Sequence, residues 1–364
     1  MYNHINCKQK NDFQNIEKLR EILQLNSEEV DILHTVNQQY PIKVNNYYLS
    51  LIDLHNPLDP IRKMCVPGFE ELLPNGNEDT SGELENTVLS GVQHKYHQTA
   101  LILSSKECFV YCRHCFRKRI VGLDSAESLI SLDEMQKYIK NNPTINNVLV
   151  SGGDAFYNTN ADIKKYLDAL VELEQLDFIR FGTRVPVVFP HRINGDNELL
   201  NMLKEYNRKK QIYVITQFNH PTEITSEAKL AIRNLQLTGI IVKNQTVLLK
   251  GVNDSSQIIS SLLTKLTTCG VVPYYIFQCR PVRGVINRFQ VPLRKGIEIV
   301  EQAKNNQNGQ GKCMRYVLSH PTGKIEIIGN LSDGNMLFKY HQAKKDEDLN
   351  RIFIKNIALD QCWI

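Results

Sequence analysis

The sequence predicts an α/β fold: a partial, TIM-like barrel of six strand–helix units. Six short apolar runs read as buried strands, at residues 99–105, 147–153, 178–184, 212–218, 240–249 and 271–278. After the first pair, their centres lie about 30 residues apart, the length of one βα unit. Apolar residues recur with helical period between them, as in residues 161–176 and 227–237. Repeated right-handed units of this kind form a parallel sheet that can curve into an open barrel.

Three segments are expected along the chain. Residues 1–90 read as a helical N-terminal extension, residues 91–290 as the barrel, and residues 291–364 as a C-terminal segment. The last segment contains a predicted helix at 296–306, followed at 315–329 by a pattern typical of two strands around a turn.

Composition excludes several classes of protein. The chain has 364 residues, 42% of them hydrophobic, and a net charge of +4, which is too mild to make nucleic acid the expected partner. No apolar run reaches the roughly 18 residues of a membrane span, and the first residues lack the apolar stretch of a signal peptide. The nine cysteines are an odd number in a large chain, which argues against a disulfide framework. We therefore expect a soluble, cytoplasmic protein.

Unusual polar residues follow the predicted strands. The motifs are the cysteine cluster 108–115, SGGD at 151–154, TRVP at 183–186, QFNHP at 217–221 and QCRP at 278–281, while the fifth strand itself contains NQ at 244–245. The carboxyl ends of barrel strands are where active sites form. This pattern predicts an enzyme whose site gathers these motifs.

The stretch CFVYCRHCFRKR, residues 108–119, carries three cysteines, Cys108, Cys112 and Cys115, spaced C-x3-C-x2-C. Structural zinc requires four protein ligands, and only one C-x2-C pair is present. A [4Fe–4S] cluster held by three cysteines leaves one iron open. An open iron can bind S-adenosylmethionine, whose reductive cleavage gives a 5′-deoxyadenosyl radical.

Two other interpretations of this stretch are weaker. A helix would place the three cysteines on one face as core residues, but five basic neighbours are poorly suited to a helix core. A nucleic-acid patch fits poorly with a chain of nearly balanced charge. The basic residues can instead hold anionic carboxylates and phosphates.

The ordered motifs YCRHCFRKR, SGGD, GTRVPVVFPHRI, FNHP, NQTVLLKGVND and PYYIFQC, between about residues 90 and 325, resemble the lysine 2,3-aminomutase family of the radical SAM superfamily. On its substrate residues the chain is more similar to glutamate 2,3-aminomutases than to lysine-specific members. The resemblance implies an isomerase with a radical SAM barrel and a C-terminal pyridoxal phosphate (PLP)-binding segment.

The resemblance assigns cofactor-binding residues. The three cysteines would bind the [4Fe–4S] cluster. The residues implied at S-adenosylmethionine are Ser151, Gly152, Gly153, Asp154, Arg184, Gln217 and Gln245. Gly152 and Gly153 allow close backbone approach, and Asp154 can accept from an ammonium. The family usually has histidine at Gln217.

Lys324, in HPTGK, matches the lysine that holds PLP covalently in the family. Such a lysine needs a partly desolvated site that keeps its amine neutral. The alternative is a solvent-exposed lysine in a hairpin turn. Lys95 and Tyr96 lie in a segment that meets the PLP phosphate, where Lys95 and Thr99 replace the family's arginines.

Arg117 matches the arginine that grips the substrate α-carboxylate. Lysine-specific members hold the distal ammonium with two aspartates, whose places are taken here by Arg280 and Ser319. Like charges about 4 Å apart repel by roughly 4 kcal/mol at an effective dielectric near 20. We therefore predict a glutamate-like substrate, unless Arg280 turns toward a phosphate or a helix carboxylate.

The expected partners are a small amino-acid substrate, a flavodoxin- or ferredoxin-type electron donor and further copies of the chain, with no nucleic acid and no membrane. Only Cys269 and Cys362 lie near the family's structural zinc positions, so we expect no such zinc. Alternative functions are a lysine 2,3-aminomutase acting on free or protein-linked lysine, and a radical SAM enzyme without PLP. A non-enzymatic alternative is an iron–sulfur redox sensor or nucleic-acid binder.

Overall fold

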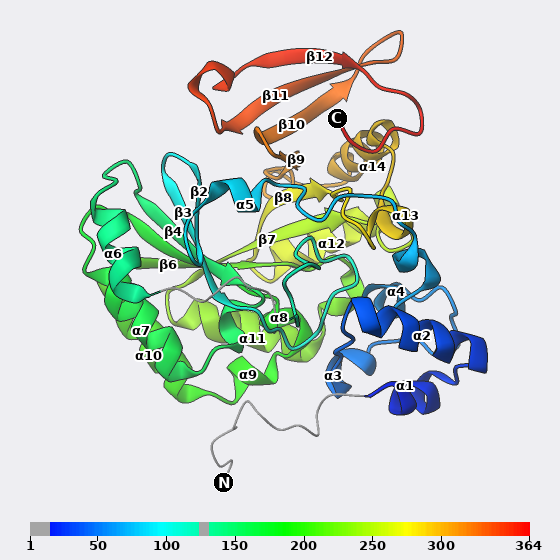
Figure 1. Ribbon diagram of the computed structural model, residues 1–364, viewed down its shortest axis with the longest axis horizontal. Coiled ribbons are helices and arrows are strands. Elements are labelled where there is room, and N and C mark those ends of the chain that lie inside the picture. The colour runs from blue at the N-terminus through cyan, green and yellow to red at the C-terminus, as the bar shows by residue number, and fades with distance from the viewer. Residues whose placement is uncertain (1–14, 124–130) are drawn as a thin grey trace.

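The computed structural model describes residues 15–123 and 131–364, so the expectation about the first residues lies outside the described part. One twelve-stranded sheet dominates the molecule, and its strands pair in chain order from β1 to β12. The sheet curves, with helices around its outer face (Figure 1). The division into three segments stays a prediction.

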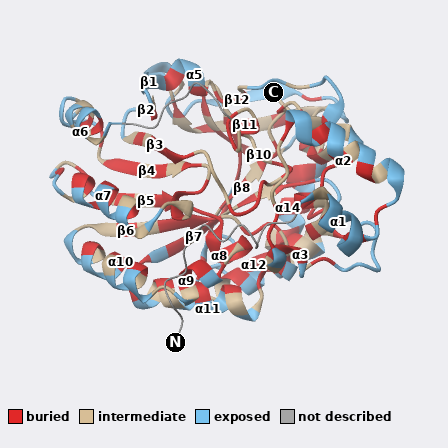
Figure 2. Ribbon diagram, turned by 60° about the horizontal axis from the view of Figure 1, so that its bottom comes forward, coloured by how far each residue is buried: buried red, intermediate tan, exposed pale blue. Residues whose placement is uncertain are grey.

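The middle of the sheet is parallel, as the sequence predicts. The six predicted strands are β3 (Thr99–Ser105), β4 (Asn147–Gly152), β5 (Phe178–Gly182), β6 (Gln211–Thr216), β7 (Ile241–Leu248) and β8 (Val272–Gln278). Each pairs in parallel with the next. A further strand, β9 (Arg315–His320), also pairs in parallel with β8 and extends this run. The strand ends agree with prediction because these apolar runs are buried (Figure 2).

Helices cover the outer face of the parallel strands (Figure 1). The longer ones are α6 (Leu132–Lys140), α7 (Asn160–Val171), α10 (Asn197–Lys209), α11 (Ser226–Leu237) and α12 (Ser256–Thr268). Short elements lie after the strands: a 3₁₀ turn at Ala155–Tyr157, α8 (Val185–Val188), α9 (His191–Asn194) and a 3₁₀ turn at Pro221–Glu223. Threonine caps begin two of the long helices, because Thr159 and Thr225 accept from backbone N–H groups of the first turn.

Antiparallel strands close both edges of the parallel sheet. At the first edge, β1 (Thr87–Leu89) and β2 (Val92–Tyr96) pair ahead of β3. At the other edge, β10 (Gly323–Asn330), β11 (Asn335–Ala343) and β12 (Ile352–Asn356) continue from β9. The connection from β8 to β9 contains α13 (Ile286–Phe289) and α14 (Leu293–Asn305). Leu293, Val300 and Phe338 belong to a second apolar core beneath this edge.

The N-terminal extension is mostly helical, as expected. Its elements are α1 (Ile16–Leu23), α2 (Ser27–Gln39), α3 (Asn46–Leu49), α4 (Pro60–Cys65), a 3₁₀ turn at Phe69–Leu72 and α5 (Glu83–Asn86). It binds the cysteine stretch directly, since the Tyr111 and Arg113 amides donate to the carbonyls of Lys43 and Met64, each at 2.8 Å. The extension therefore helps to shape the ends of the barrel strands.

Within the described residues, 15–123 and 131–364, no helix combines the length and apolar character needed to cross a membrane.

Candidate active site

One cavity of about 380 Å³ opens where the parallel strands end, and every residue expected at the site lines it. These residues are Lys95, Tyr96, Cys108, Cys112, Cys115, Arg117, Ser151, Gly152, Gly153, Asp154, Arg184, Gln217, Gln245, Arg280, Ser319 and Lys324. They come from segments far apart in the sequence. The fold thus brings the predicted cysteine, glycine and lysine motifs to a single space.

The cysteine stretch is a loop with turns and contains no helix, so the core-helix interpretation is wrong. Cys108, Cys112 and Cys115 are partly exposed and free. Burial raises the pKa of the Cys108 thiol, and that of Cys115 to about 11. The Cys108 and Cys115 thiols are therefore protonated until a metal, which favours the thiolate, binds them.

The thiols do not converge on one point. In the described part of the chain, no three His, Cys, Asp or Glu side chains gather closely enough to hold a single metal ion. In a [4Fe–4S] cluster each thiolate binds a different iron, so a wider spacing is compatible with a cluster. His114 lines the same cavity: its Nε2 lies 3.2 Å from Asn219 Nδ2, and its Nδ1 is buried with no hydrogen-bond partner among the described residues.

Two basic residues of the stretch bind a buried carboxylate of the N-terminal extension. Glu71 Oε2 lies 2.7 Å from Arg113 Nη2 and 2.5 Å from Lys118 Nζ. Although burial raises the pKa of Glu71, the two cations lower it to about 2. Arg113 and Lys118 therefore form buried ion pairs with Glu71. This corrects the expectation that the basic residues of the cysteine stretch hold ligand anions. No motif in the sequence marks Glu71.

Arg117 is likewise held by an unpredicted carboxylate, Glu83. Its Nε donates to Glu83 Oε1 at 2.8 Å, and its Nη1 donates to the Gly152 carbonyl at 3.1 Å. Arg119 binds the other oxygen of Glu83 at 3.2 Å. The Arg117 guanidinium is thus fixed at the cavity wall, between the cysteine stretch and the end of β4.

The two glycines of SGGD permit a close contact within the chain itself. Gly152 has φ of +118°, and a Cβ there would lie 2.3 Å from the Ser105 carbonyl oxygen. A Cβ on Gly153 would lie 2.4 Å from the Glu107 carbonyl oxygen. The glycines therefore let the end of β4 pack against the backbone that leads into the cysteines, which differs from the expected approach of a ligand.

Asp154 follows the end of β4 and accepts several hydrogen bonds within the chain. Its carboxylate accepts from Thr183 Oγ1 at 2.5 Å, from the Arg184 amide at 2.7 Å and from the Phe156 amide at 2.9 Å. It is buried, and burial raises its pKa despite these donors. Asp154 therefore ties the end of β4 to the end of β5, with both oxygens already engaged.

Arg184 lies beside the thiols. Its Nη1 donates to Cys112 Sγ at 2.5 Å, while its Nη2 binds Glu223 Oε1 at 2.6 Å and its Nε donates to the Gln217 carbonyl at 3.0 Å. Glu223 was not predicted, and it fixes this guanidinium. Gln245 lies within β7, whose pairing with β8 continues to Leu248, as the NQ pair inside the fifth predicted strand indicates.

Lys324 lies near the start of β10 and faces the cavity, so the solvent-exposed turn alternative is wrong. Its Nζ donates to Gln342 Oε1 at 2.9 Å and lies 4.3 Å from the centre of the Tyr275 ring. Burial, with the charges of Arg180, Lys95 and Arg280, lowers the pKa of Lys324 to about 7. The structure thus provides a lysine amine that is partly neutral near pH 7, as a nucleophilic lysine requires.

Lys95, on β2, reaches the same region. Its Nζ donates to the His320 carbonyl at 2.5 Å and to the Ser81 carbonyl at 3.3 Å. Burial, reinforced by Arg280, lowers its pKa to about 7. Lys95 is therefore held by neutral carbonyls and is only partly charged near pH 7.

Arg280 and Ser319, the two substituted substrate positions, contact each other. Arg280 Nη2 donates to Ser319 Oγ at 2.7 Å, and its guanidinium lies 4.1 Å from the centre of the Phe116 ring. Its Nη1 is buried without a hydrogen-bond partner. Burial lowers the pKa of Arg280 to about 10, with Glu83 opposing the shift, so it remains a cation at neutral pH.

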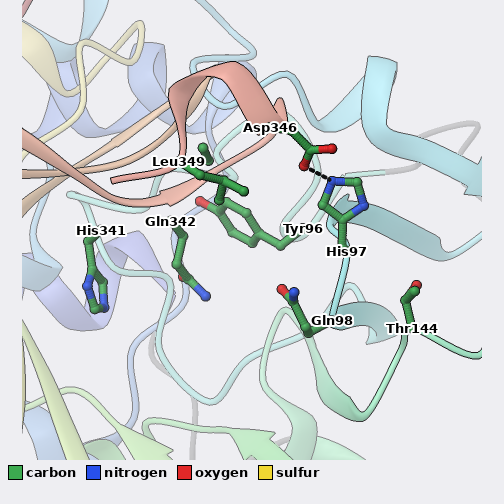
Figure 3. Close-up of a pocket in the computed structure, with 9 residues that line it drawn as sticks. Tyr96, His97, Gln98, Thr144, His341, Gln342, Asp346 and Leu349 are labelled. Atoms are coloured by element: carbon green, nitrogen blue, oxygen red, sulfur yellow. Dashed lines mark ion pairs between the residues drawn. The ribbon is translucent and has the colours of Figure 1, made fainter. Parts of the chain in front are cut away.

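A second cavity of about 390 Å³ adjoins the first (Figure 3). Tyr96 and Gln342 line both cavities and form the boundary between them. Across the second cavity, His97 pairs with Asp346 at 3.2 Å. Because Gln342 also accepts from Lys324, the boundary is tied to the lysine amine.

Comparison with known proteins identifies close relatives, although no protein-family model matches the chain. A putative L-lysine 2,3-aminomutase from Aquifex aeolicus is 39% identical over 338 residues, covering 92% of this chain and 90% of that protein. The L-lysine 2,3-aminomutase from Acetoanaerobium sticklandii is 38% identical, covering 88% and 77%. The glutamate 2,3-aminomutase from Clostridioides difficile is 34% identical, covering 88% and 75%.

The solved structures that resemble this chain match only part of it. A radical SAM methyltransferase from Sphaerobacter thermophilus gives a TM-score of 0.42 at 14% identity, covering 62% of this chain and 68% of that one. The relatives of high coverage are named for both lysine and glutamate, so overall identity does not select a substrate. The chain belongs to the lysine 2,3-aminomutase family, a family of isomerases.

Proposed function

We propose that the chain is a radical SAM, PLP-dependent 2,3-aminomutase that moves the α-amino group of a glutamate-like amino acid to its β-carbon. The observation that carries this proposal is one cavity lined by three free thiols, a lysine of lowered pKa and the Arg280–Ser319 pair. The names of the relatives support the reaction type.

The residues present fit both implied cofactors. The three free thiols of the cysteine stretch suit a cluster with an open iron. A fourth free cysteine on the cavity wall, Cys279, lies outside that stretch, directly after β8. Lys324, surrounded by cations, suits an aldehyde that carries a phosphate. When bound, the cluster and S-adenosylmethionine supply a carbon radical, and PLP supplies a conjugated ring through which an amine can migrate.

The chain's own residues bind, orient and exclude water. Arg184, fixed by Glu223, donates a hydrogen bond to Cys112 Sγ and so helps to position this thiol in the cavity. Lys324 would offer a neutral amine to the cofactor aldehyde. Arg117, fixed by Glu83, is positioned for the α-carboxylate of the substrate. A buried wall around these groups limits side reactions with water.

The proposed substrate preference rests on Arg280. The buried Nη1 without a partner can donate to a carboxylate of the substrate, and Ser319 orients the guanidinium through Nη2. A lysine side chain would bring its ammonium toward this cation. Repulsion of about 4 kcal/mol at roughly 4 Å would outweigh most of its binding.

The direct test is turnover of L-glutamate and L-lysine by anaerobic, reduced, PLP-loaded protein, measured as β-amino product. We expect glutamate to be used at least about tenfold better, a ratio that corresponds to 1.4 kcal/mol. A clear preference for lysine would support the alternative, a lysine 2,3-aminomutase, and would contradict the glutamate assignment.

A second assay separates the PLP-dependent enzyme from a radical SAM enzyme without PLP. The visible absorbance of PLP bound to the wild type should vanish in Lys324→Ala, while cleavage of S-adenosylmethionine persists. Unchanged PLP absorbance in Lys324→Ala would refute the role of this lysine. An electron donor of the flavodoxin or ferredoxin type and assembly into homo-oligomers are further parts of the proposal.

A further inference from the structure

Arg180 is a cation of the cavity wall that neither the motifs nor the proposed function uses. It lies in the middle of β5, in register with Leu149 of β4, and both residues line the cavity. Its position is therefore deeper than the strand-end residues Arg184 and Asp154, which follow the carboxyl ends of β5 and β4.

The contacts of Arg180 leave part of its guanidinium unused. Its Nη2 donates to Asn147 Oδ1 at 2.5 Å, and the same oxygen accepts from Thr99 Oγ1 at 3.2 Å. Its Nε is buried and has no hydrogen-bond partner among the residues that the structure describes. No carboxylate of residues 15–123 or 131–364 forms an ion pair with it. Arg180 is partly buried, and its guanidinium also lies 5.9 Å from the centre of the Phe178 ring. A partly buried charge whose hydrogen bond goes to a neutral oxygen gains from an anionic ligand.

The surroundings of Arg180 also lack negative charge. Among neighbouring charges, Arg180 contributes most to the lowered pKa of Lys324, after burial itself, and Lys95 and Arg280 act in the same direction. Gln93 adds a second buried donor without a partner, its Nε2, on the wall of the same cavity. Cations and unpaired donors thus surround Lys324, the lysine proposed to react with the cofactor aldehyde. Such a group would bind an anion that has several acceptor oxygens.

We propose that Arg180 binds the phosphate of the PLP that Lys324 captures, with Asn147 and Thr99 holding the guanidinium in place. The phosphate suits this place better than a substrate carboxylate does. The strand-end cations Arg117 and Arg280 already face the substrate region, whereas Arg180 lies deeper in the barrel. This inference rests on the proposed use of PLP.

The test compares PLP with pyridoxal, which has the same aldehyde and no phosphate. Binding of each to anaerobically purified protein is measured from the absorbance that depends on Lys324, in wild type, Arg180→Gln and Arg180→Lys. We expect Arg180→Gln to weaken PLP binding about 10- to 100-fold, the usual range for losing a charge-assisted hydrogen bond, and to change pyridoxal binding less than about threefold. Arg180→Lys should restore part of the PLP affinity.

The outcomes separate the alternatives. Unchanged PLP affinity in Arg180→Gln overturns the inference, and so does equal weakening of both ligands, which would indicate a structural role, because pyridoxal binding reports whether the pocket still folds. A raised KM for glutamate with unchanged PLP affinity would overturn it in favour of a carboxylate contact. If the wild type binds neither compound at Lys324, the proposed use of PLP fails first, and the inference falls with it.

Discussion

The basic side chains at the two ends of the cavity, beside the cysteines and around Lys324, have different kinds of partner. Beside the cysteines, four basic residues each form an ion pair with a buried carboxylate. These pairs are Arg113 and Lys118 with Glu71, Arg117 with Glu83, and Arg184 with Glu223. Around Lys324 the basic residues are Lys95, Arg180, Arg280 and Lys324 itself, and their hydrogen bonds go to neutral oxygens.

This difference indicates different roles. A cation that is already neutralised by a buried carboxylate shapes the loop that presents the thiols, and losing its partner damages the fold. A partly buried cation whose hydrogen bonds go only to neutral oxygens is poised for an anionic ligand. The comparison predicts that variants of Glu71 and its two partners, Arg113 and Lys118, change stability, whereas variants of the cations around Lys324 change ligand affinity.

The largest effect is expected at the thiols between the two ends. Cys112→Ser should reduce bound iron and cleavage of S-adenosylmethionine to background, because a serine hydroxyl is a far poorer ligand for iron than a thiolate. Iron content and 5′-deoxyadenosine, measured anaerobically, check this. Cys313→Ser is the matched control, since Cys313 is exposed and away from the cavity. Full iron content in Cys112→Ser would refute the proposed cluster.

The next largest effect concerns stability. Glu71→Gln leaves Arg113 and Lys118 buried without a carboxylate, so we expect a loss of about 3–5 kcal/mol in the free energy of unfolding at pH 7. Urea unfolding measures it. Glu78→Gln, which breaks a pair of exposed residues with Arg283, is the control and should cost at most about 1 kcal/mol.

The same residue gives a pH dependence. The pKa of Glu71 is about 2 in the folded protein and about 4.5 as a free side chain. Its stabilising contribution is therefore full above pH 4.5 and is lost as the pH falls toward 2. The difference between wild type and Glu71→Gln should shrink over that window. A difference that stays constant down to pH 2.5 would contradict the assignment.

A smaller effect is expected at the ligand end. Arg280→Gln keeps a side chain of similar polarity without its charge, so kcat/KM for glutamate should fall about 10- to 100-fold, with the free energy of unfolding nearly unchanged. Steady-state kinetics and urea unfolding on one preparation check both halves. A large loss of stability with unchanged kcat/KM would place Arg280 with the structural cations and undo the comparison.

The smallest predicted effect is in the pH dependence of Lys324. Because its pKa is lowered from 10.5 to about 7, the neutral amine is available far below the usual pH. The rate of pyridoxal capture should rise about tenfold per unit below pH 7 and level off above it. Stopped-flow absorbance measures this rate. A rate that still rises tenfold between pH 8 and 9 would show an ordinary lysine.

Much of the fold and of the site followed from local patterns. The six parallel strands are apolar runs whose spacing is set by one βα unit, and their ends agree with the structure. The thiols, Lys324 and Arg280 were identifiable because they belong to short motifs placed after strands or in a C-terminal turn. Their presence on one cavity wall follows from the common edge at which parallel strands end.

The sequence by itself therefore determined the order of the strands, the place of the thiols and the identity of the candidate lysine. Only the tertiary structure decided which cations are neutralised. Glu71 lies 42 residues before Arg113, and Glu83 lies 34 residues before Arg117, in an extension with no recognisable motif. Periodicity reports burial and chain direction, whereas an ion pair depends on where two distant side chains meet in space. For this reason only the folded chain shows which basic residues beside the cysteines pair with carboxylates. It also shows that the cations around Lys324 hydrogen-bond to neutral oxygens and so suit an anionic ligand.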